Sequence, residues 1–530
     1  SNQLDNWARI QADRFKNNVI RGFHTELETV YEEKNMSLTQ DGRKVIDAIL
    51  AALYTKHPYG TQTILGSQEH LKNPSITNIK NFYKQWYVPN NMAICMSGDF
   101  DYDEAMDVIE KYFGDMQPNK DLQMMDFEAE PEITAPVERE VMGLESENVT
   151  MAWRLPGATT DEALMLEVVD AIMNNGKAGI IDLNLLQEQK LLSAYSFPYA
   201  MADYTSYILQ GTPKEGQDLD EVRAMMLAQV DSLRQGKWDE SLLAAGIANY
   251  KLQMQKMLED NESRADLFVQ AFVNNQPWAD VVQRIEKMEK ITKDDVVAFA
   301  NNYLKDNNYA VVYKRQGEDP NIKKVNKPAI TPIFMNRDTT SAFLREVQAS
   351  VVAPIEPVFV SFSKDMSQGT VGKLPLLYKK NETNDIFALQ YIYDFGTSEM
   401  KDMGIAASYL DYLGTSDMTA AEIKLAFYNL ACNYYISASK DRVVVGLSGL
   451  AENMPKAMEL LENVLADAQP DKEAYDGLVD DILRARLNDK ADQQANFSRL
   501  QTYTLYGPNN PSNTILSEAE LRSMAPETLL

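Results

Sequence analysis

One unit of sequence occurs twice in this chain, 217 residues apart. Residues 76–99 read ITNIKNFYKQWYVPNNMAICMSGD, and residues 291–318 read ITKDDVVAFANNYLKDNNYAVVYKRQGE. Both begin with Ile-Thr, which predicts a helix start capped by the Thr, and both place Asn-Asn eight residues after a Phe. Each then continues into an apolar stretch typical of a strand. Because the offset is far longer than a solenoid period, it indicates duplicated domains of about 200 residues.

A second resemblance within the chain extends this interpretation to a third domain. Residues 54–77 and 503–527 share Tyr-Gly, then Thr-Ile-Leu, then an acidic helix start. Polar, proline-containing stretches near 117–135 and 317–357 mark the joints. We therefore expect domains at 1–130, 131–320 and 351–530 with a linker at 321–350, the third being a shortened copy of the first. Strands and helices do not alternate strictly, which favours an α+β fold of mixed sheets with helices packed on one face.

Composition narrows the functional classes. The chain carries 78 Asp and Glu against 51 Lys and Arg, a net charge of −27 that disfavours binding to nucleic acid. It has no apolar run long enough for a membrane span. The two cysteines, Cys95 and Cys432, form no disulfide or metal-binding pattern and leave the compartment open. Cys95 lies in MAICMSG, which predicts a buried strand and an apolar core residue.

An acidic helix near the start of the chain is the candidate functional segment. In GFHTELETVYEEKN, residues 22–35, Glu26, Val30 and Glu33 recur at spacings of four and three. This spacing places all three on one helix face. Such a face is either solvated surface or lies against something positive. His24 and Glu28, four residues apart, are expected to be a surface ion pair, and His57 a turn residue.

Several segments resemble the pitrilysin and insulinase family of zinc peptidases, which includes the mitochondrial processing peptidases. They are RFKNNVIRGFHTELETVYEEKN, HPYGTQTILGS, YVPNNMAICMSGDFD, MAWRLPG and GTSEMKDMGIAASYLDYLGTSDMTAAE, in family order along the whole chain. The resemblance implies homologous α+β domains whose two halves close around an unfolded peptide. It also implies Zn²⁺ held by His-x-x-Glu-His and by a Glu on a later helix.

The family pattern implies that Glu33 is the carboxylate ligand and that Glu26 orients a ligand histidine from outside the metal. Glu32 is the alternative ligand, one residue out of register. Two histidines and one carboxylate suit catalytic zinc, and a second carboxylate fixes an imidazole through its other nitrogen. The sequence, however, contains no His-x-x-Glu-His, and its only histidines are His24, His57 and His70. No catalytic residue is therefore expected in this chain, and the general base is expected upstream of Ser1.

The third domain contains a degenerate version of the missing motif. In GIAASYLDYLGT, residues 404–415, the resemblance places Ser408, Asp411 and Tyr412 where the family has His, Glu and His. An ungapped count also sets Glu26 opposite Glu473 and Glu33 opposite Asp480. We expect this third-domain copy to bind no metal.

The resulting hypothesis is a zinc endopeptidase of which this chain is an inactive fragment. It would act on peptides or unfolded segments, bound in extended form along a sheet edge, and a complementing chain with the missing segments would restore activity. The alternative is a non-catalytic peptide-binding or scaffold subunit. The compartment is left open between the periplasm or envelope and the cytoplasm of a bacterium.

Overall fold

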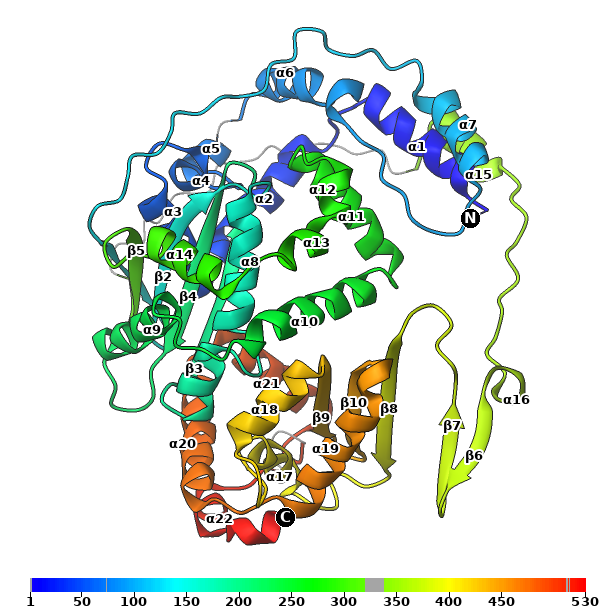
Figure 1. Cartoon of the computed structure of the whole chain (residues 1–530). Helices are drawn as coiled ribbons and strands as arrows, with labels where there is room; N and C mark the ends of the chain where they lie inside the picture. Colours follow the sequence, from blue (N-terminus) through cyan, green and yellow to red (C-terminus); the bar gives the residue numbers. More distant parts are fainter. Residues whose placement is uncertain (1, 73, 320–337, 511–512, 514) are drawn as a thin grey trace.

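The computed structural model describes residues 2–72, 74–319, 338–510, 513 and 515–530 (Figure 1). Much of the predicted linker 321–350 lies outside the described residues. Within the described part, helices and mixed sheets combine as the sequence predicts for the α+β class. No described helix is both long and apolar enough to cross a bilayer.

The described residues before Val137 form helices joined by irregular segments. The helices are α1 (Leu4–Lys16), α2 (Phe23–Ser37), α3 (Asp41–Leu53), α4 (Pro58–Thr61), α5 (Gln68–Lys72), α6 (Ile76–Trp86) and α7 (Tyr102–Phe113). Helix α6 is not capped by the predicted Thr77, because the Ser75 hydroxyl accepts the N–H of Asn78 at 3.2 Å. In the second copy the prediction is confirmed, since Thr292 caps its helix in a capping box.

The predicted buried strand around Cys95 is wrong. Residues 92–97 form no strand, and Cys95 is only partly buried. A strand exists only where a neighbouring strand supplies ladder hydrogen bonds. None of the described residues provides one here, so the apolar pattern of the segment is left without a partner.

A five-stranded sheet forms the centre of the molecule. Its strands are β1 (Val137–Gly143), β2 (Asn148–Pro156), β3 (Ser193–Ala200), β4 (Tyr204–Thr212) and β5 (Tyr309–Gln316). The order is β1-β5-β2-β4-β3, with β1 parallel to β5 and the other pairs antiparallel. The last strand in sequence therefore inserts between the first two.

One face of this sheet is covered by the helices that follow its own strands. They are α8 (Asp161–Met173), α9 (Leu219–Arg234), α10 (Ser241–Met257) and α14 (Lys293–Tyr303). The core beneath them contains Met151 and Trp153, both 0% exposed, which alternate along β2 with residues facing the other way. Three further helices continue the layer: α11 (Asn261–Val273), α12 (Trp278–Val282) and α13 (Arg284–Met288).

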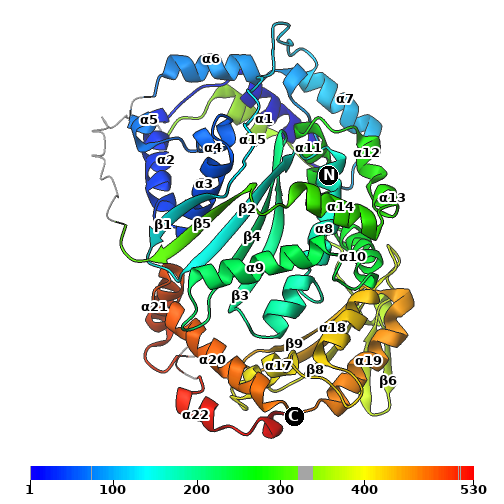
Figure 2. The same cartoon turned by 60° about the vertical axis from the view of Figure 1, so that its left-hand side comes forward.

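The opposite face of the sheet is covered by α3, an arrangement the sequence did not predict (Figure 2). Val45, Ile49 and Leu53 of α3 are at most 2% exposed and pack on Ala152 and Ala310. Each of these three side chains contributes about 1.5–3 kcal/mol through burial. The first segment of the chain is thus anchored to the central sheet.

A buried ion pair fixes the start of α3 to the same sheet. Lys314 of β5 is 0% exposed, and its Nζ lies 2.9 Å from Asp41 Oδ2. Lys44 reaches the other oxygen of Asp41 at 3.0 Å, and the backbone N–H of Glu145 donates to Oδ2 at 2.9 Å. Burial raises the pKa of Asp41, but these donors and cations outweigh it and lower the pKa overall.

The remainder of the chain builds a smaller sheet with its own core. Strands β8 (Ile386–Tyr393), β9 (Cys432–Ala438) and β10 (Val443–Leu450) pair antiparallel in the order β8-β10-β9. The helices of this part are α17 (Met403–Leu410), α18 (Ala420–Asn429), α19 (Met454–Asp467), α20 (Lys472–Asn488), α21 (Gln493–Tyr506) and α22 (Glu518–Ser523). Leu447 and Leu461, at most 1% exposed, lie at the centre of this core.

Between the two sheets the chain makes a detour. Helix α15 (Ala342–Ala349) returns to the first segment, where Glu346 pairs with Arg9 of α1 at 2.6 Å. After the short helix α16 (Phe362–Asp365), strands β6 (Ser367–Val371) and β7 (Leu374–Tyr378) form a hairpin. Every residue of both strands is exposed, and Figure 1 shows the hairpin standing away from β8.

Candidate functional site

The acidic face of α2 is exposed along its length. The helix begins after Gly22, whose φ of 62° is left-handed, and it buries Tyr31 and Lys34. Glu26 and Glu33 both lie on its exposed side, separated by about 10.5 Å along the axis. Within the described residues neither carboxylate makes a hydrogen bond or ion pair.

The neighbouring acid, Glu32, is already engaged. Its Oε2 accepts a hydrogen bond from Asn35 Nδ2 at 3.2 Å. Asn35 in turn accepts from Gln68 of α5 at 2.6 Å, which ties this side of α2 to the rest of the first segment. Of the two ligand registers considered for this helix, Glu33 is the more available.

The chain does not assemble a zinc site from its own described residues. Nowhere among them do three His, Cys, Asp or Glu side chains come together. Catalytic zinc takes three protein ligands, so the lone carboxylate of Glu33 is insufficient. His24 is exposed and its ring lies edge-on to Phe23 at 5.5 Å, while His70 is exposed on α5. The residues present do not fit Zn²⁺ without further ligands.

His57 lies in a joint between the first segment and the central sheet. It is 2% exposed and caps α4, where its Nδ1 accepts the backbone N–H of Tyr59 at 3.3 Å. That bond assigns the proton to Nε2, which donates to Asp203 Oδ2 at 3.1 Å. The rings of Tyr59, Phe127 and Tyr204 lie 4.1, 4.7 and 5.4 Å from the imidazole. His57 is thus a packed turn residue with both ring nitrogens engaged.

Glu130 completes this joint. Its carboxylate accepts the backbone N–H groups of Thr55, Lys56 and His57 at 2.9, 2.7 and 2.6 Å. Burial raises the pKa of Glu130, but the three donors outweigh it and lower the pKa overall. The His57–Asp203 contact could not be predicted, because its partners are 146 residues apart and belong to no shared motif.

The three residues of the degenerate motif do not converge. Ser408 lies on α17 and donates to the carbonyl of Gly404 in its own helix at 3.1 Å. Asp411 accepts the Tyr434 hydroxyl at 3.3 Å. Tyr412 is half-buried, and burial raises the pKa of its hydroxyl. These side chains serve local packing of the smaller sheet.

The acids of α20 are paired with cations of the chain itself. Asp480, the counterpart of Glu33 by ungapped counting, points outward to Arg522 at 3.1 Å. Asp481 faces inward, near Tyr412, and meets Lys214 from the central domain at 2.9 Å. Their side chains are 60% and 16% exposed, respectively. A lysine ammonium thus supplies the positive charge beside this helix.

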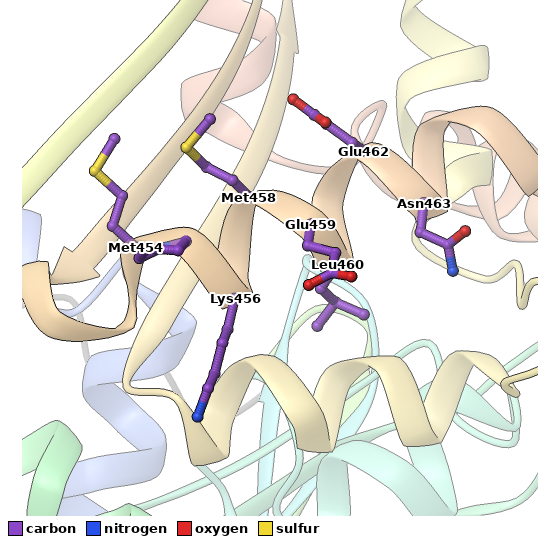
Figure 3. A pocket seen from close by; sticks show the side chains of 8 residues that line it. Met454, Lys456, Met458, Glu459, Leu460, Glu462 and Asn463 are labelled. Atoms are coloured by element: carbon purple, nitrogen blue, oxygen red, sulfur yellow. The ribbon is translucent and has the colours of Figure 1, made fainter.

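A depression beside α19 does not resemble a catalytic site. It has a volume of about 900 Å³ and is lined only by α19. Figure 3 shows Met454, Met458 and Glu462 pointing to one side of this helix, and Lys456 and Leu460 to the other. Because no second element contributes side chains, no set of polar groups converges there.

Comparison with known proteins finds similarity to peptidases. The family described as "Peptidase M16 inactive domain" matches residues 75–250, from the start of α6 into α10. The zinc protease PqqE of Helicobacter pylori is 22% identical over 271 residues, covering 49% of this chain and 59% of that protein. The chain is thus similar to M16 peptidases over part of its length. This confirms the insulinase-like resemblance found in the sequence.

Two further matches, one in sequence and one in structure, each cover more than half of this chain. An uncharacterized zinc protease of Mycobacterium tuberculosis, Rv2782c, is 23% identical over 292 residues, covering 53% of this chain and 64% of that protein. The crystal structure of a protease from Helicobacter pylori shares the fold with a TM-score of 0.56 and 20% identity, covering 59% of this chain and 76% of that one. The chain thus spans about 60% of the length of the curated M16 relatives it matches.

Proposed function

We propose that this chain is the body of a zinc-dependent endopeptidase that acts on peptides or unfolded segments. The observation that carries the proposal is the pair of unpartnered carboxylates, Glu26 and Glu33, on one exposed face of α2. At about 10.5 Å along the axis, one carboxylate can bind a metal directly while the other acts on it through a second ligand. The names of the M16 relatives support zinc as that metal.

In this proposal Glu33 supplies one carboxylate ligand, and Glu26 accepts a hydrogen bond from a histidine that binds the metal. The histidines and the general base come from a His-x-x-Glu-His segment outside these 530 residues, on the same polypeptide or on a complementing chain. Zinc held there would provide an electrophile for peptide hydrolysis. The 530 residues alone would bind zinc weakly and cut no peptide.

A second candidate is a non-catalytic peptide-binding or scaffold subunit. Two observations favour it: the matched family is the inactive M16 domain, and the described residues contain no three-ligand group. In this alternative, Glu26 and Glu33 are solvated surface. Replacing either carboxylate with the neutral amide of glutamine would then leave the function unchanged.

Zinc content and cleavage of a quenched fluorogenic peptide separate the two candidates. The longer polypeptide containing a His-x-x-Glu-His segment is compared with the present chain and with Glu33→Gln and Glu32→Gln variants of the longer form. The peptidase proposal predicts one zinc and cleavage in the longer form and in Glu32→Gln, and loss of both in Glu33→Gln. An intact but metal-free and inactive longer form would establish the scaffold alternative.

A further inference from the structure

A cavity in the part of the chain that contains the smaller sheet is lined by three cations. It has a volume of about 480 Å³ and lies where helices α17, α20 and α22 meet (Figures 1 and 2). Lys401 lines it from the loop before α17, Lys440 from the turn between β9 and β10, and Arg486 from α20. No Asp or Glu is among the described residues that line it. We call this cavity the basic pocket.

The floor of the basic pocket is apolar. Ile405 of α17 and Leu521 of α22 are 6% and 1% exposed, and both belong to the core of the smaller sheet. Ile482 of α20 and Leu516 also line the pocket and pack against the same core. The pocket thus offers apolar surface and positive charge side by side. This combination is typical of a site for an organic anion.

The two lysines of the pocket are not neutralised within the described chain. The Nζ atoms of Lys401 and Lys440 form no ion pair and no hydrogen bond there. Lys401 acts through space on Glu520, but Oε2 of that carboxylate already accepts the N–H and the hydroxyl of Ser517, both at 2.7 Å. An anion that enters the pocket therefore meets two ammonium groups that no described carboxylate holds.

Hydrogen-bond donors lie beside these charges. Arg486 donates from Nη1 to the carbonyl of Leu516 at 2.8 Å, which fixes the guanidinium and leaves its further N–H groups for a ligand. Thr397 and Ser398 also line the pocket, and their hydroxyls form no hydrogen bond within the described chain. An ionised carboxylate is an acceptor only, so each of these groups complements one.

The wall that carries Lys440 is held in place by the chain itself. The backbone N–H of Thr397 donates to the Ser439 carbonyl at 2.8 Å. The next N–H, of Ser398, donates to the Lys440 carbonyl at 2.9 Å. The two loops approach so closely that a Cβ at Gly396 would lie 2.3 Å from the Ser439 oxygen. Because the loops are joined in this way, a ligand that binds between their side chains has little backbone to order.

We propose that the basic pocket binds an acidic segment of a peptide, in which a carboxylate side chain neighbours an apolar one. The carboxylate is held among Lys401, Lys440 and Arg486, and the apolar side chain rests on Ile405 and Leu521. This deepens the proposed function by naming a class of peptide, and it rests on the peptide binding that both candidate functions share. The chain as a whole, with a net charge of −27, repels such a peptide, so its binding is confined to the pocket.

A peptide fits the basic pocket better than a small free anion does. Its volume of about 480 Å³ lies within the range of about 300–1,000 Å³ that is usual for pockets that enclose larger organic ligands. The cations come from three separate elements around an apolar floor. A ligand with several side chains can contact the cations and the floor at once, whereas a lone carboxylate leaves the floor uncovered.

Calorimetric titration of the present chain tests the proposal with two peptides blocked at both ends, Leu-Glu-Val-Leu-Glu and its neutral counterpart Leu-Gln-Val-Leu-Gln. We expect the acidic peptide to bind at least about tenfold more tightly. Lys401→Gln combined with Lys440→Gln should reduce this preference to about twofold or less, without weakening the neutral peptide. The matched control, Lys379→Gln combined with Lys456→Gln, removes the same charge from exposed lysines outside the pocket and should keep the preference.

Equal affinities of the two peptides for the wild-type chain, or no binding of either, would overturn the proposal. So would an equal loss in the two double variants, because the effect would then come from overall charge. Octanoate, a free apolar carboxylate, should bind at least about tenfold more weakly than the acidic peptide, and equal binding would assign the pocket to small anions instead. None of these titrations needs zinc or cleavage, so this proposal and the peptidase proposal can fail separately.

Discussion

The buried pair between Asp41 and Lys314 makes a quantitative prediction about how the first segment is held. Asp41→Asn removes the charge that faces an ammonium group with 0% exposure. The carbonyls of Glu145 and Ser146 remain as acceptors for Lys314, and the Glu145 carboxylate acts on it only through space. Removing one partner of a buried ion pair typically costs about 3–5 kcal/mol. We expect a loss of this size in the free energy that holds α3 on the sheet.

The reverse change should cost less. Lys314→Met leaves Asp41 with Lys44 at 3.0 Å and with the N–H of Glu145 at 2.9 Å, so the carboxylate keeps a cation and a donor. We expect about 1–3 kcal/mol. The double variant should cost less than the sum of the two single changes, because both act on one interaction.

Hydrogen–deuterium exchange of the α3 amides measures this directly. A loss of 3 kcal/mol corresponds to exchange faster by a factor of about 100 or more. The matched control is Asp47→Asn on the same helix, which breaks an exposed pair with Arg43 at 3.1 Å and should change the opening free energy by under about 1 kcal/mol. Equal effects of Asp41→Asn and Asp47→Asn would refute the reasoning.

The pH dependence of the same contact has a definite sign. The pKa of Asp41 is lowered in the folded chain, so its contribution is complete above the ordinary carboxylate pKa of about 3.9. It is lost as pH falls through the lowered folded value. Protection of α3 in the wild-type chain should therefore stay level from pH 7 to pH 5 as far as this group is concerned, and fall only below about pH 4.

Three further predictions concern other parts of the molecule. Burial raises the pKa of Asp170 to about 6, so the central sheet should lose up to about 3 kcal/mol of stability as the pH rises from 4 to 6. Asp170→Asn should remove this loss and flatten that part of a plot of the urea midpoint against pH. Lys214→Met leaves Asp481 half-buried without its cation and should speed hydrogen exchange in α20; unchanged exchange would contradict the pairing. Leu461→Ala, at a 0% exposed core site, should cost about 2–5 kcal/mol in chemical denaturation, against under 1 kcal/mol for Leu465→Ala, which is 42% exposed on the same helix.

Local pattern was sufficient for many elements of the fold. The spacing of Glu26, Val30 and Glu33 predicted a helix where α2 lies, and the Ile-Thr start with the apolar stretch after it predicted α14 and β5. Thr292 was predicted as a cap because its capping box lies within four residues. The same reasoning chose Thr77 wrongly, because Ser75 lies two residues earlier and offers an equally good oxygen.

Features that depend on distant partners were not predictable. Cys95 sits in an apolar run of strand type, yet a run becomes a strand only when another strand lies beside it. Nothing in the sequence of helix α3 shows that it would cover a sheet built from residues 137–316. For the candidate site, spacing placed Glu26 and Glu33 on one helix face, whereas the pairing of Asp481 with Lys214 comes from tertiary packing alone.

The place of β5 in the central sheet has a consequence for how the chain is made. β1 and β2 cannot pair with each other, because β5 lies between them, and β5 follows β1 by about 170 residues. At ribosomal rates of about 5–20 residues per second, roughly 10–35 s pass before the strand that joins them is synthesised. During that interval the apolar edges of β1 and β2 are unsatisfied, and contacts of such long sequence separation form slowly. We therefore expect the nascent chain to expose these strand edges until residue 316 has emerged.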